Sequence, residues 1–201
     1  DIDGYSVGLY GTWFQHQDRR EGFYADAWVK RSWFDHSVKG RGLPEESFDS
    51  RLWSASLEGG YSATIFESDR AQWSFDPSFQ AIYKRGSGGP GRNGGALVGG
   101  WADNSWVTRL GGRIHGRIRT DHDIGLSPYF EANWLHDTAS GRVSLDQDAV
   151  HSNRPENTAE FKLGLTADWA EGLSATIGLS TELGADKFRH VGGQAGLRFE
   201  W

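Results

Sequence analysis

Apolar and polar residues alternate along nine stretches of this chain, which is the pattern of a β-strand with one face in an apolar environment. In the first stretch, Val7, Leu9 and Trp13 share one face, while Ser6 and Thr12 lie on the other. The nine stretches cover residues 5–13, 23–33, 53–62, 73–84, 109–119, 128–134, 160–169, 174–183 and 191–201. The pattern therefore predicts an all-β, antiparallel protein with nine visible strands and no helix.

The connections between these stretches alternate between short and long. The short ones lie at residues 15–22, 64–72, 120–126 and 170–172, and the long ones at 35–51, 86–105 and 137–157. Outer-membrane barrels have short periplasmic turns and longer external loops, and the long set here is rich in Gly, Asp, Arg and Ser. We therefore predict surface loops at 86–100 and 140–155.

Composition excludes several classes of protein. With 37% hydrophobic residues and a mean hydropathy of −0.60, no stretch approaches the ~20 apolar residues of a membrane-spanning helix. A barrel strand needs only about 9 to 11 residues, so the low hydropathy does not exclude a membrane barrel. The net charge of −6, with both signs mixed along the chain, provides no basic surface for nucleic acid and argues against nucleic-acid partners. The absence of cysteine excludes disulfides and thiolate metal sites.

Alternation alone does not say which face looks inward, because a soluble ligand-binding β-barrel such as a lipocalin alternates equally well. Two features favour a lipid-facing apolar side. Charged residues occupy the polar face of neighbouring strands, and tryptophans lie near strand ends, as in the aromatic girdles of membrane barrels. These tryptophans are Trp13, Trp33, Trp53, Trp73, Trp134, Trp169 and Trp201.

The polar face gives the candidate lumen residues, which carry charges of both signs. They are Glu58, Asp76, Arg109, Arg113, Arg117, Glu131, Asn133, Lys162 and Arg198, with Glu160 and Glu182 as further acids. Such a set either contacts a segment inside the lumen or sets ion selectivity by a field across a pore. The alternative, which we favour, is a hydrated network of ion pairs with a structural role.

Enzyme chemistry has little support. The segments Asp121-His122-Asp123 and His136-Asp137 bring carboxylates and imidazoles together, and both lie in turns or at loop starts. No nucleophile is paired with them and no zinc-ligand spacing occurs. We therefore expect no catalytic residues, no metal and no cofactor.

Arg31 is the one charged residue on the apolar face of its stretch. An exposed Arg costs roughly 2 to 4 kcal/mol at the bilayer midplane and much less near the interface. We therefore predict that Arg31 lies at the rim of the membrane band.

Six ordered motifs resemble the C-terminal β-domain of bacterial autotransporters of the pertactin-like class. They are GYSVGLYGTWF at 4–14, GFYADAWVKRSWFDHSVKGRGLP at 22–44, WSASLEGGYS at 53–62, SFDPSFQAIY at 74–83, TRLGGRIHGR at 108–117 and SPYFEANWLH at 127–136. The resemblance implies a translocator barrel in the bacterial outer membrane, in contact with outer-membrane lipid and a passenger segment. Glu131 and Asn133 fall in its EANW motif. A free-standing porin-like channel remains the nearest alternative.

The C-terminal residues Gln194, Gly196, Phe199 and Trp201 have the spacing of a polar residue, a glycine and two hydrophobic residues. This ending resembles the signal read by the outer-membrane barrel assembly machinery. The alternative is a last strand that merely finishes in an aromatic residue.

The strand count departs from the family pattern, which has twelve strands preceded by a linker helix in the lumen. We predict a single barrel domain over residues 1–201 that lacks the family's first strands and that helix. Strands one and nine would run in the same direction, so direct closure would need a parallel pair, whereas bacterial barrels close antiparallel. The barrel is therefore expected to be truncated, engineered or completed by another segment.

Overall fold

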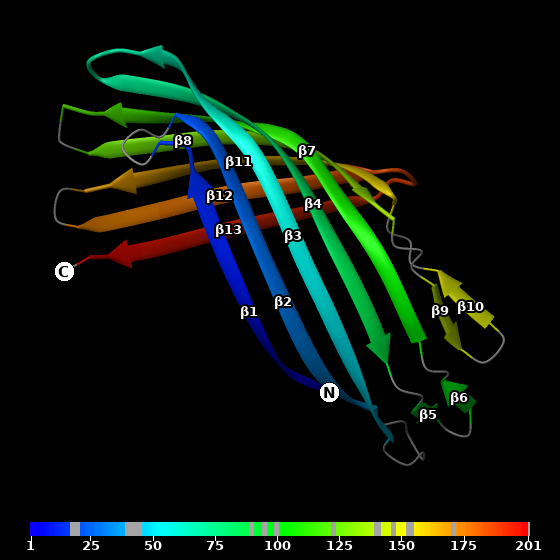
Figure 1. Cartoon of the computed structure of the whole chain (residues 1–201). Helices are drawn as coiled ribbons and strands as arrows, with labels where there is room; N and C mark the ends of the chain where they lie inside the picture. Colours follow the sequence, from blue (N-terminus) through cyan, green and yellow to red (C-terminus); the bar gives the residue numbers. More distant parts are fainter. Residues whose placement is uncertain are drawn as a thin grey trace.

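The computed structural model is a single curled sheet of nine antiparallel strands, each paired with the next along its order in the chain (Figure 1). Its strands are β1 (Ile2–Phe14), β2 (Gly22–Val38), β3 (Glu46–Glu67), β4 (Ala71–Gly88), β7 (Trp101–Arg119), β8 (Gly125–Asp137), β11 (Asn157–Asp168), β12 (Leu173–Gly184) and β13 (Arg189–Phe199). The structure describes residues 1–16, 21–38, 46–88, 91–93, 96–98, 101–121, 124–138, 142–145, 148–151, 155–169 and 172–200. The nine predicted strands are confirmed.

Four short strands lie within the two long connections that were predicted as plain surface loops. They form two hairpins, β5 (Gly91–Asn93) with β6 (Ala96–Val98) and β9 (Arg142–Leu145) with β10 (Asp148–His151). Strands of three or four residues are too short to show a period of two. The loop interpretation was therefore wrong for these segments.

Several strands also extend beyond the alternating stretches. β3 begins at Glu46, seven residues before the alternation starts at Trp53. Alternation arises only where one face meets an apolar medium, and five of the six residues 46–51 are polar, with Phe48 as the exception. This extension is paired backbone without an apolar face, which a hydrophobic pattern does not reveal.

Burial in this sheet is the reverse of that in a soluble protein. Among the described residues the only buried hydrophobic side chain is Val107, whereas the buried polar residues are Ser32, Ser50, Ser54, Ser56, Ser74, Ser105, Asn133 and Thr158. Large apolar side chains such as Leu9 and Leu57 are 76% and 63% exposed. Soluble barrels keep apolar side chains inside. The apolar face is thus the outer one, and the soluble-barrel alternative is wrong.

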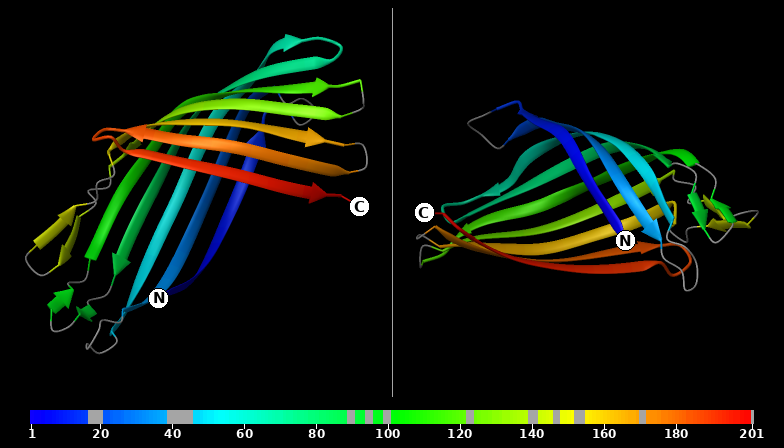
Figure 2. Two further views of the ribbon diagram at one scale, coloured as in Figure 1. Left: turned by 180° about the vertical axis from the view of Figure 1, so that it is seen from behind. Right: turned by 90° about the horizontal axis from the view of Figure 1, so that it is seen from below.

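The sheet curls over without closing, so that β1 and β13 are its two free edges (Figure 2). With every neighbouring pair antiparallel, β1 and β13 run in the same direction. The expected absence of direct closure is therefore observed within the described strands.

In the part of the chain that the structure describes, no helix has the length and apolarity required to cross a membrane.

Aromatic side chains contact one another across strands at both ends of the outer face. Tyr5 stacks on Trp33 with ring centroids 4.9 Å apart at the long-connection end, and Phe23 meets Tyr61 at 4.8 Å at the short-turn end. Arg31 lies beside Trp33 and opposite Trp53. Arg31 therefore lies level with the aromatic residues of the long-connection end, and its depth in the membrane stays a prediction.

Close backbone approach on the inner face requires a glycine at position 111. Gly111 in β7 lies opposite Asn133 in β8, and a Cβ there would overlap the Asn133 side chain and lie 2.5 Å from the Ala132 carbonyl oxygen. Gly11 on the outer face of β1 has nothing within 4 Å of its Cβ position. The two glycines therefore make a matched pair for testing the packing of the inner face.

We predict that Gly111→Ala destabilises the folded protein by about 1 to 3 kcal/mol, because overpacking against a carbonyl oxygen forces the strands apart. Gly11→Ala should be neutral or slightly stabilising, because the added methyl group restricts only the unfolded chain. The stability of each variant is measured as the temperature at which its compact, heat-modifiable gel band disappears in detergent. Equal shifts for the two variants would contradict the packing assignment.

Candidate functional site in the polar interior

The inner face carries a hydrogen-bonded network centred on Glu131 of β8. Its Oε1 atom accepts a hydrogen bond from Asn133 Nδ2 at 2.7 Å and lies 3.4 Å from Lys162 Nζ and 3.8 Å from Arg109 Nη1. Asn133, which is 6% exposed, also donates to Glu160 Oε2 at 2.8 Å. One carboxylate thus gathers side chains from β7, β8 and β11.

The network continues in both directions around the sheet. Arg109 Nη2 lies 2.8 Å from Glu58 Oε2 on β3, and the Tyr24 hydroxyl on β2 donates to Glu58 Oε1 at 3.2 Å. On the other side, Lys162 Nζ lies 2.9 Å from Glu160 Oε2. Hydrogen bonds and ion pairs therefore link β2 with β11 across the inner face.

Strand register explains why these side chains meet. In the β8–β11 pair, Lys162 lies directly opposite Glu131, and Glu160 lies opposite Asn133. Register alone would pair Glu131 with Arg113, its direct neighbour on β7. The Arg113 guanidinium instead stacks 4.3 Å over the Tyr129 ring, a cation–π contact that leaves Glu131 to Arg109 and Lys162.

The network carries three carboxylates, on Glu58, Glu131 and Glu160, against the cations of Arg109 and Lys162. One formal negative charge remains. The side chains in these ion pairs are 12% to 29% exposed, so water screens them only in part. Each charge keeps a partner of opposite sign, which is the condition for stable charges away from bulk water.

A second cluster lies nearer the short turns. His115 Nε2 lies 2.9 Å from Asp76 Oδ2, and the Ser62 hydroxyl donates to Asp76 Oδ1 at 2.6 Å. These residues join β3, β4 and β7 on the same inner face.

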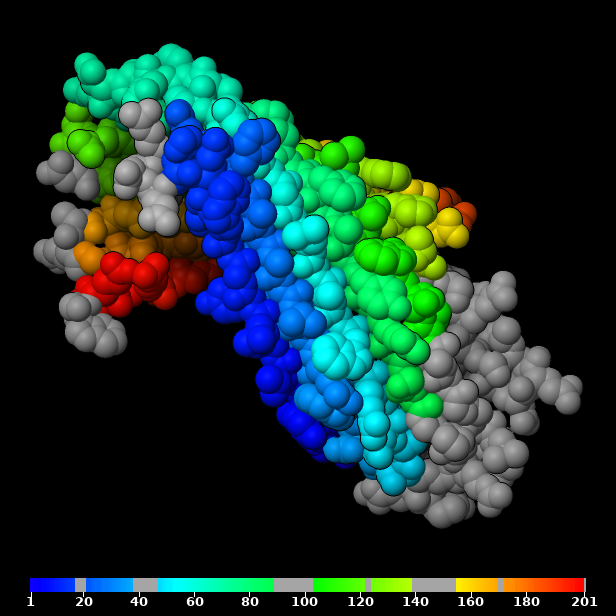
Figure 3. Space-filling view, viewed as in Figure 1, coloured from blue at the N-terminus to red at the C-terminus, as the bar shows by residue number. Residues whose placement is uncertain are grey.

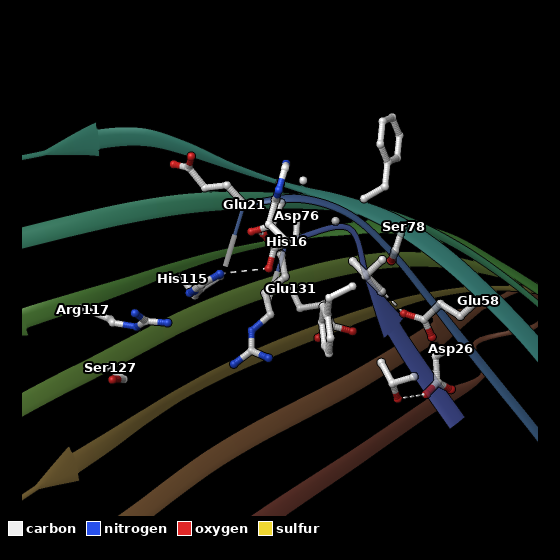
Figure 4. A pocket seen from close by; sticks show the side chains of 18 of the residues that line it. His16, Glu21, Asp26, Glu58, Asp76, Ser78, His115, Arg117, Ser127 and Glu131 are labelled. Atoms are coloured by element: carbon white, nitrogen blue, oxygen red, sulfur yellow. Dashed lines mark hydrogen bonds and ion pairs between the residues drawn. The ribbon is translucent and has the colours of Figure 1, made fainter. Parts of the chain in front are cut away.

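Both clusters border one hollow of about 900 Å³ enclosed by the curl of the sheet. Asp26, Glu58 and Asp76 enter it from β2, β3 and β4, and His115 and Arg117 from β7 (Figure 4). Acidic side chains of β2 to β4 are thus followed around the hollow by the basic side chains of β7, and Glu131 of β8 follows these. The arrangement can hold a polar segment by hydrogen bonds along its length.

The structure brings five of the predicted lumen residues into one network and places three more around the same hollow. The network contains Glu58, Arg109, Glu131, Asn133 and Lys162, and the hollow is also lined by Asp76, Arg113 and Arg117. Arg198 stands apart, because its exposed side chain pairs with Glu200. Tyr24 and His115 were not among the predicted site residues, although both occupy the polar face of their strands.

The two local clusters considered for enzyme chemistry have other partners where they are described. Asp121 pairs with Arg70 at 2.8 Å, and His136 Nδ1 lies 3.0 Å from Asn157 Oδ1. His122 and Asp123 lie outside the described residues, as does Trp201. Within the described ranges no group of three or more His, Cys, Asp or Glu side chains could hold a metal ion.

A family model described as the autotransporter beta-domain matches residues 1–180, which is most of the chain. The chain belongs to the autotransporter beta-domain family. Autotransporter beta-domains sit in the bacterial outer membrane, and this one has the apolar exterior that such a location requires. The predicted resemblance and localisation are thereby confirmed.

Among relatives of this beta-domain, the autotransporter adhesin AIDA-I of Escherichia coli is 30% identical over 210 residues. That match covers 100% of this chain and 16% of the adhesin. The uncharacterized protein YdeU of E. coli K12 is 29% identical, with 100% of this chain and 45% of that protein covered. The beta-domain therefore spans less than half the length of these relatives.

Solved structures show the same fold. The transport unit of AIDA-I superposes with a TM-score of 0.81 at 29% identity, covering 100% of this chain and 66% of that one. The beta-domain of the Bordetella autotransporter BrkA gives a TM-score of 0.66 at 20% identity, covering 100% and 74%. These superpositions show that the chain has the fold of an autotransporter beta-domain.

The charge balance of the network predicts unequal effects for its two central residues. Arg109→Gln leaves Lys162 as the one cation among three carboxylates and should lower the free energy of unfolding by about 1 to 3 kcal/mol. Glu131→Gln leaves two charges of each sign and should cost less. Unfolding of the purified protein by denaturant measures both effects.

Arg198→Gln is the control, since it removes an equal charge from an exposed pair. If Arg109→Gln were no more harmful than Arg198→Gln, the network would contribute nothing to stability.

Proposed function

We propose that this domain anchors an autotransporter in the outer membrane and exports a passenger segment of the same protein to the cell surface. The observation that supports this most directly is the polar hollow inside an apolar shell, in a chain that belongs to this family. Export of this kind is transport without a bond-making step. The longer relatives leave ample chain for a passenger.

The lumen residues would contact the passing or resident segment. A segment in the hollow would meet carboxylates from β2 to β4 and guanidinium groups from β7. Its own amide and charged groups would therefore have hydrogen-bond and ion-pair partners along the length of the hollow. We assign no catalytic role to the network, because its carboxylates are engaged by Asn133, Arg109 and Lys162 rather than by a nucleophile.

Completion of the barrel requires partners for the outer edges of β1 and β13. In lipid an unpaired backbone group costs several kcal/mol, so a free edge of more than ten residues is unstable. We propose that further strands of the same protein pair with these edges. Coverage of only 66% of the AIDA-I transport unit supports this proposal.

Two partners outside the chain follow from the same proposal. Outer-membrane lipid would surround the exposed apolar face. The barrel assembly machinery would read the C-terminal pattern of Gln194, Gly196, Phe199 and Trp201, of which Phe199 is 59% exposed on the outer face of the last strand.

Export is tested in the full-length protein by asking whether the passenger reaches the cell surface. We expect external protease to remove the passenger from intact cells and to leave the beta-domain in the membrane fraction. Replacement of residues 1–201 by an unrelated outer-membrane barrel should leave the passenger in the periplasm. A passenger that still reaches the surface would overturn the proposal, and a large, steady conductance in planar bilayers would favour the porin-like channel.

The assembly signal is tested by changing Phe199 and Trp201 together to Ala. We expect at least a fivefold loss of heat-modifiable protein in the outer membrane, because a recognition contact is removed while the strand pairing stays. Leu197→Ala is the matched control, since Leu197 is 81% exposed on the same face of the same strand but lies between the signal positions. An equal loss in the control would refute a specific signal.

A further inference from the structure

Three arginines form a cluster on the outer, apolar face of the sheet. This outer-face arginine cluster consists of Arg31 on β2, Arg51 on β3 and Arg85 on β4, strands that lie side by side in Figure 3. Strand register places Arg31 opposite Trp53 and Trp53 opposite Arg85, so Arg31, Trp53 and Arg85 form one row across the sheet. Arg51 lies in the next row, opposite Trp33.

Among the residues that the structure describes, the cluster has no carboxylate in an ion pair with it. On the same face the nearest acids by register are Asp35 and Asp49, which lie opposite each other one row further outward. The cluster therefore presents uncompensated positive charge on a surface that otherwise meets lipid.

Tryptophan rings hold Arg31 in place on this surface. Its guanidinium carbon lies 4.9 Å from the ring centroid of Trp33 and 5.1 Å from that of Trp53. Its Nε atom is inaccessible to water and has no hydrogen-bond partner in the protein. Cation–π contacts fix the orientation of the guanidinium group and leave its N–H groups available to an acceptor from outside the chain.

The cluster lies at the height where the outer-leaflet headgroups begin. From Phe23, in the aromatic group at the short-turn end, to Arg31 is eight residues along β2, or ~26 Å of strand. A strand tilt of about 40° turns this into ~20 Å along the membrane normal, close to the ~25 Å height of the apolar band. The long connections beyond it mark this end as the external one.

We propose that the outer-face arginine cluster binds the phosphate groups of a phosphorylated glycolipid in the outer leaflet. Arginine binds phosphate through paired N–H donors. The Arg31 and Arg85 backbones stand two strands apart, ~10 Å, so that both side chains reach a common headgroup. Towards the membrane centre, Val29 and Leu57 continue the same face, 38% and 63% exposed, where acyl chains would lie.

The site depends only on the outer face meeting lipid and is independent of what crosses the lumen. Loss of lipid binding with intact export, or the reverse, would therefore separate this inference from the proposed function.

The test is a titration of the full-length protein, purified in detergent, with phosphorylated lipid A and with its dephosphorylated form. We expect phosphorylated lipid A to bind at least tenfold more tightly, and the double variant Arg31→Gln/Arg85→Gln to raise its Kd about tenfold. Inorganic phosphate at the same concentration should leave lipid binding unchanged, because it lacks the acyl chains.

Two matched variants control for charge and for folding. Arg70→Gln/Arg119→Gln removes the same charge from the short-turn end and should leave the Kd unchanged. Arg31→Lys/Arg85→Lys preserves the charge but removes the paired N–H donors, so it should raise the Kd by less than the glutamine variant and by more than the short-turn variant, and it keeps the test open if the glutamine variant fails to assemble. The site is refuted if both lipid forms bind equally, if the short-turn variant loses as much affinity as the glutamine or lysine variant, or if inorganic phosphate displaces the lipid.

Discussion

Backbone hydrogen bonding in a medium without water is the constraint from which the rest of this structure follows. Each N–H and C=O group in the lipid band must pair with a neighbouring strand, because no solvent is present to replace a missing partner. Long, unbroken antiparallel strands satisfy this requirement, and turns are confined to the two ends. The same constraint makes the edges of β1 and β13 the weakest part of the nine-stranded sheet.

Lipid outside also determines what the inside must be. A sheet has two faces, and when the apolar one is turned outward the polar residues are left to pack against one another. In this domain they do so through small hydroxyl side chains and through the ion pairs around Glu131. Ionic and amide contacts thus do in the interior what aliphatic side chains do in a soluble core, and one of them depends on the missing side chain of Gly111.

Sequence periodicity was informative where the two faces of a strand meet different media. It predicted the membrane-height parts of all nine strands and the inner position of Glu58, Arg109, Glu131 and Lys162. It did not predict the outward extension of β3 or the two small hairpins, since water surrounds both faces there. The choice of the arginine partner was also beyond it: Glu131 lies opposite Arg113 of β7 by register, yet it pairs with Arg109, because Arg113 stacks on Tyr129.

The strands differ greatly in length around the sheet. β3 has 22 residues and β7 has 19, whereas β13 has 11, a difference of ~36 Å along the strand between the extremes. At the long-connection end β7 extends six residues beyond its first pair with β8, which joins Val107 to Asp137, so the edge of the sheet is stepped there. The inner side of the longer strands carries the buried hydroxyl groups of Ser32, Ser50 and Ser105. For the proposed export, this step would give the exit a direction, with the longer strands as a hydroxyl-lined wall on one side.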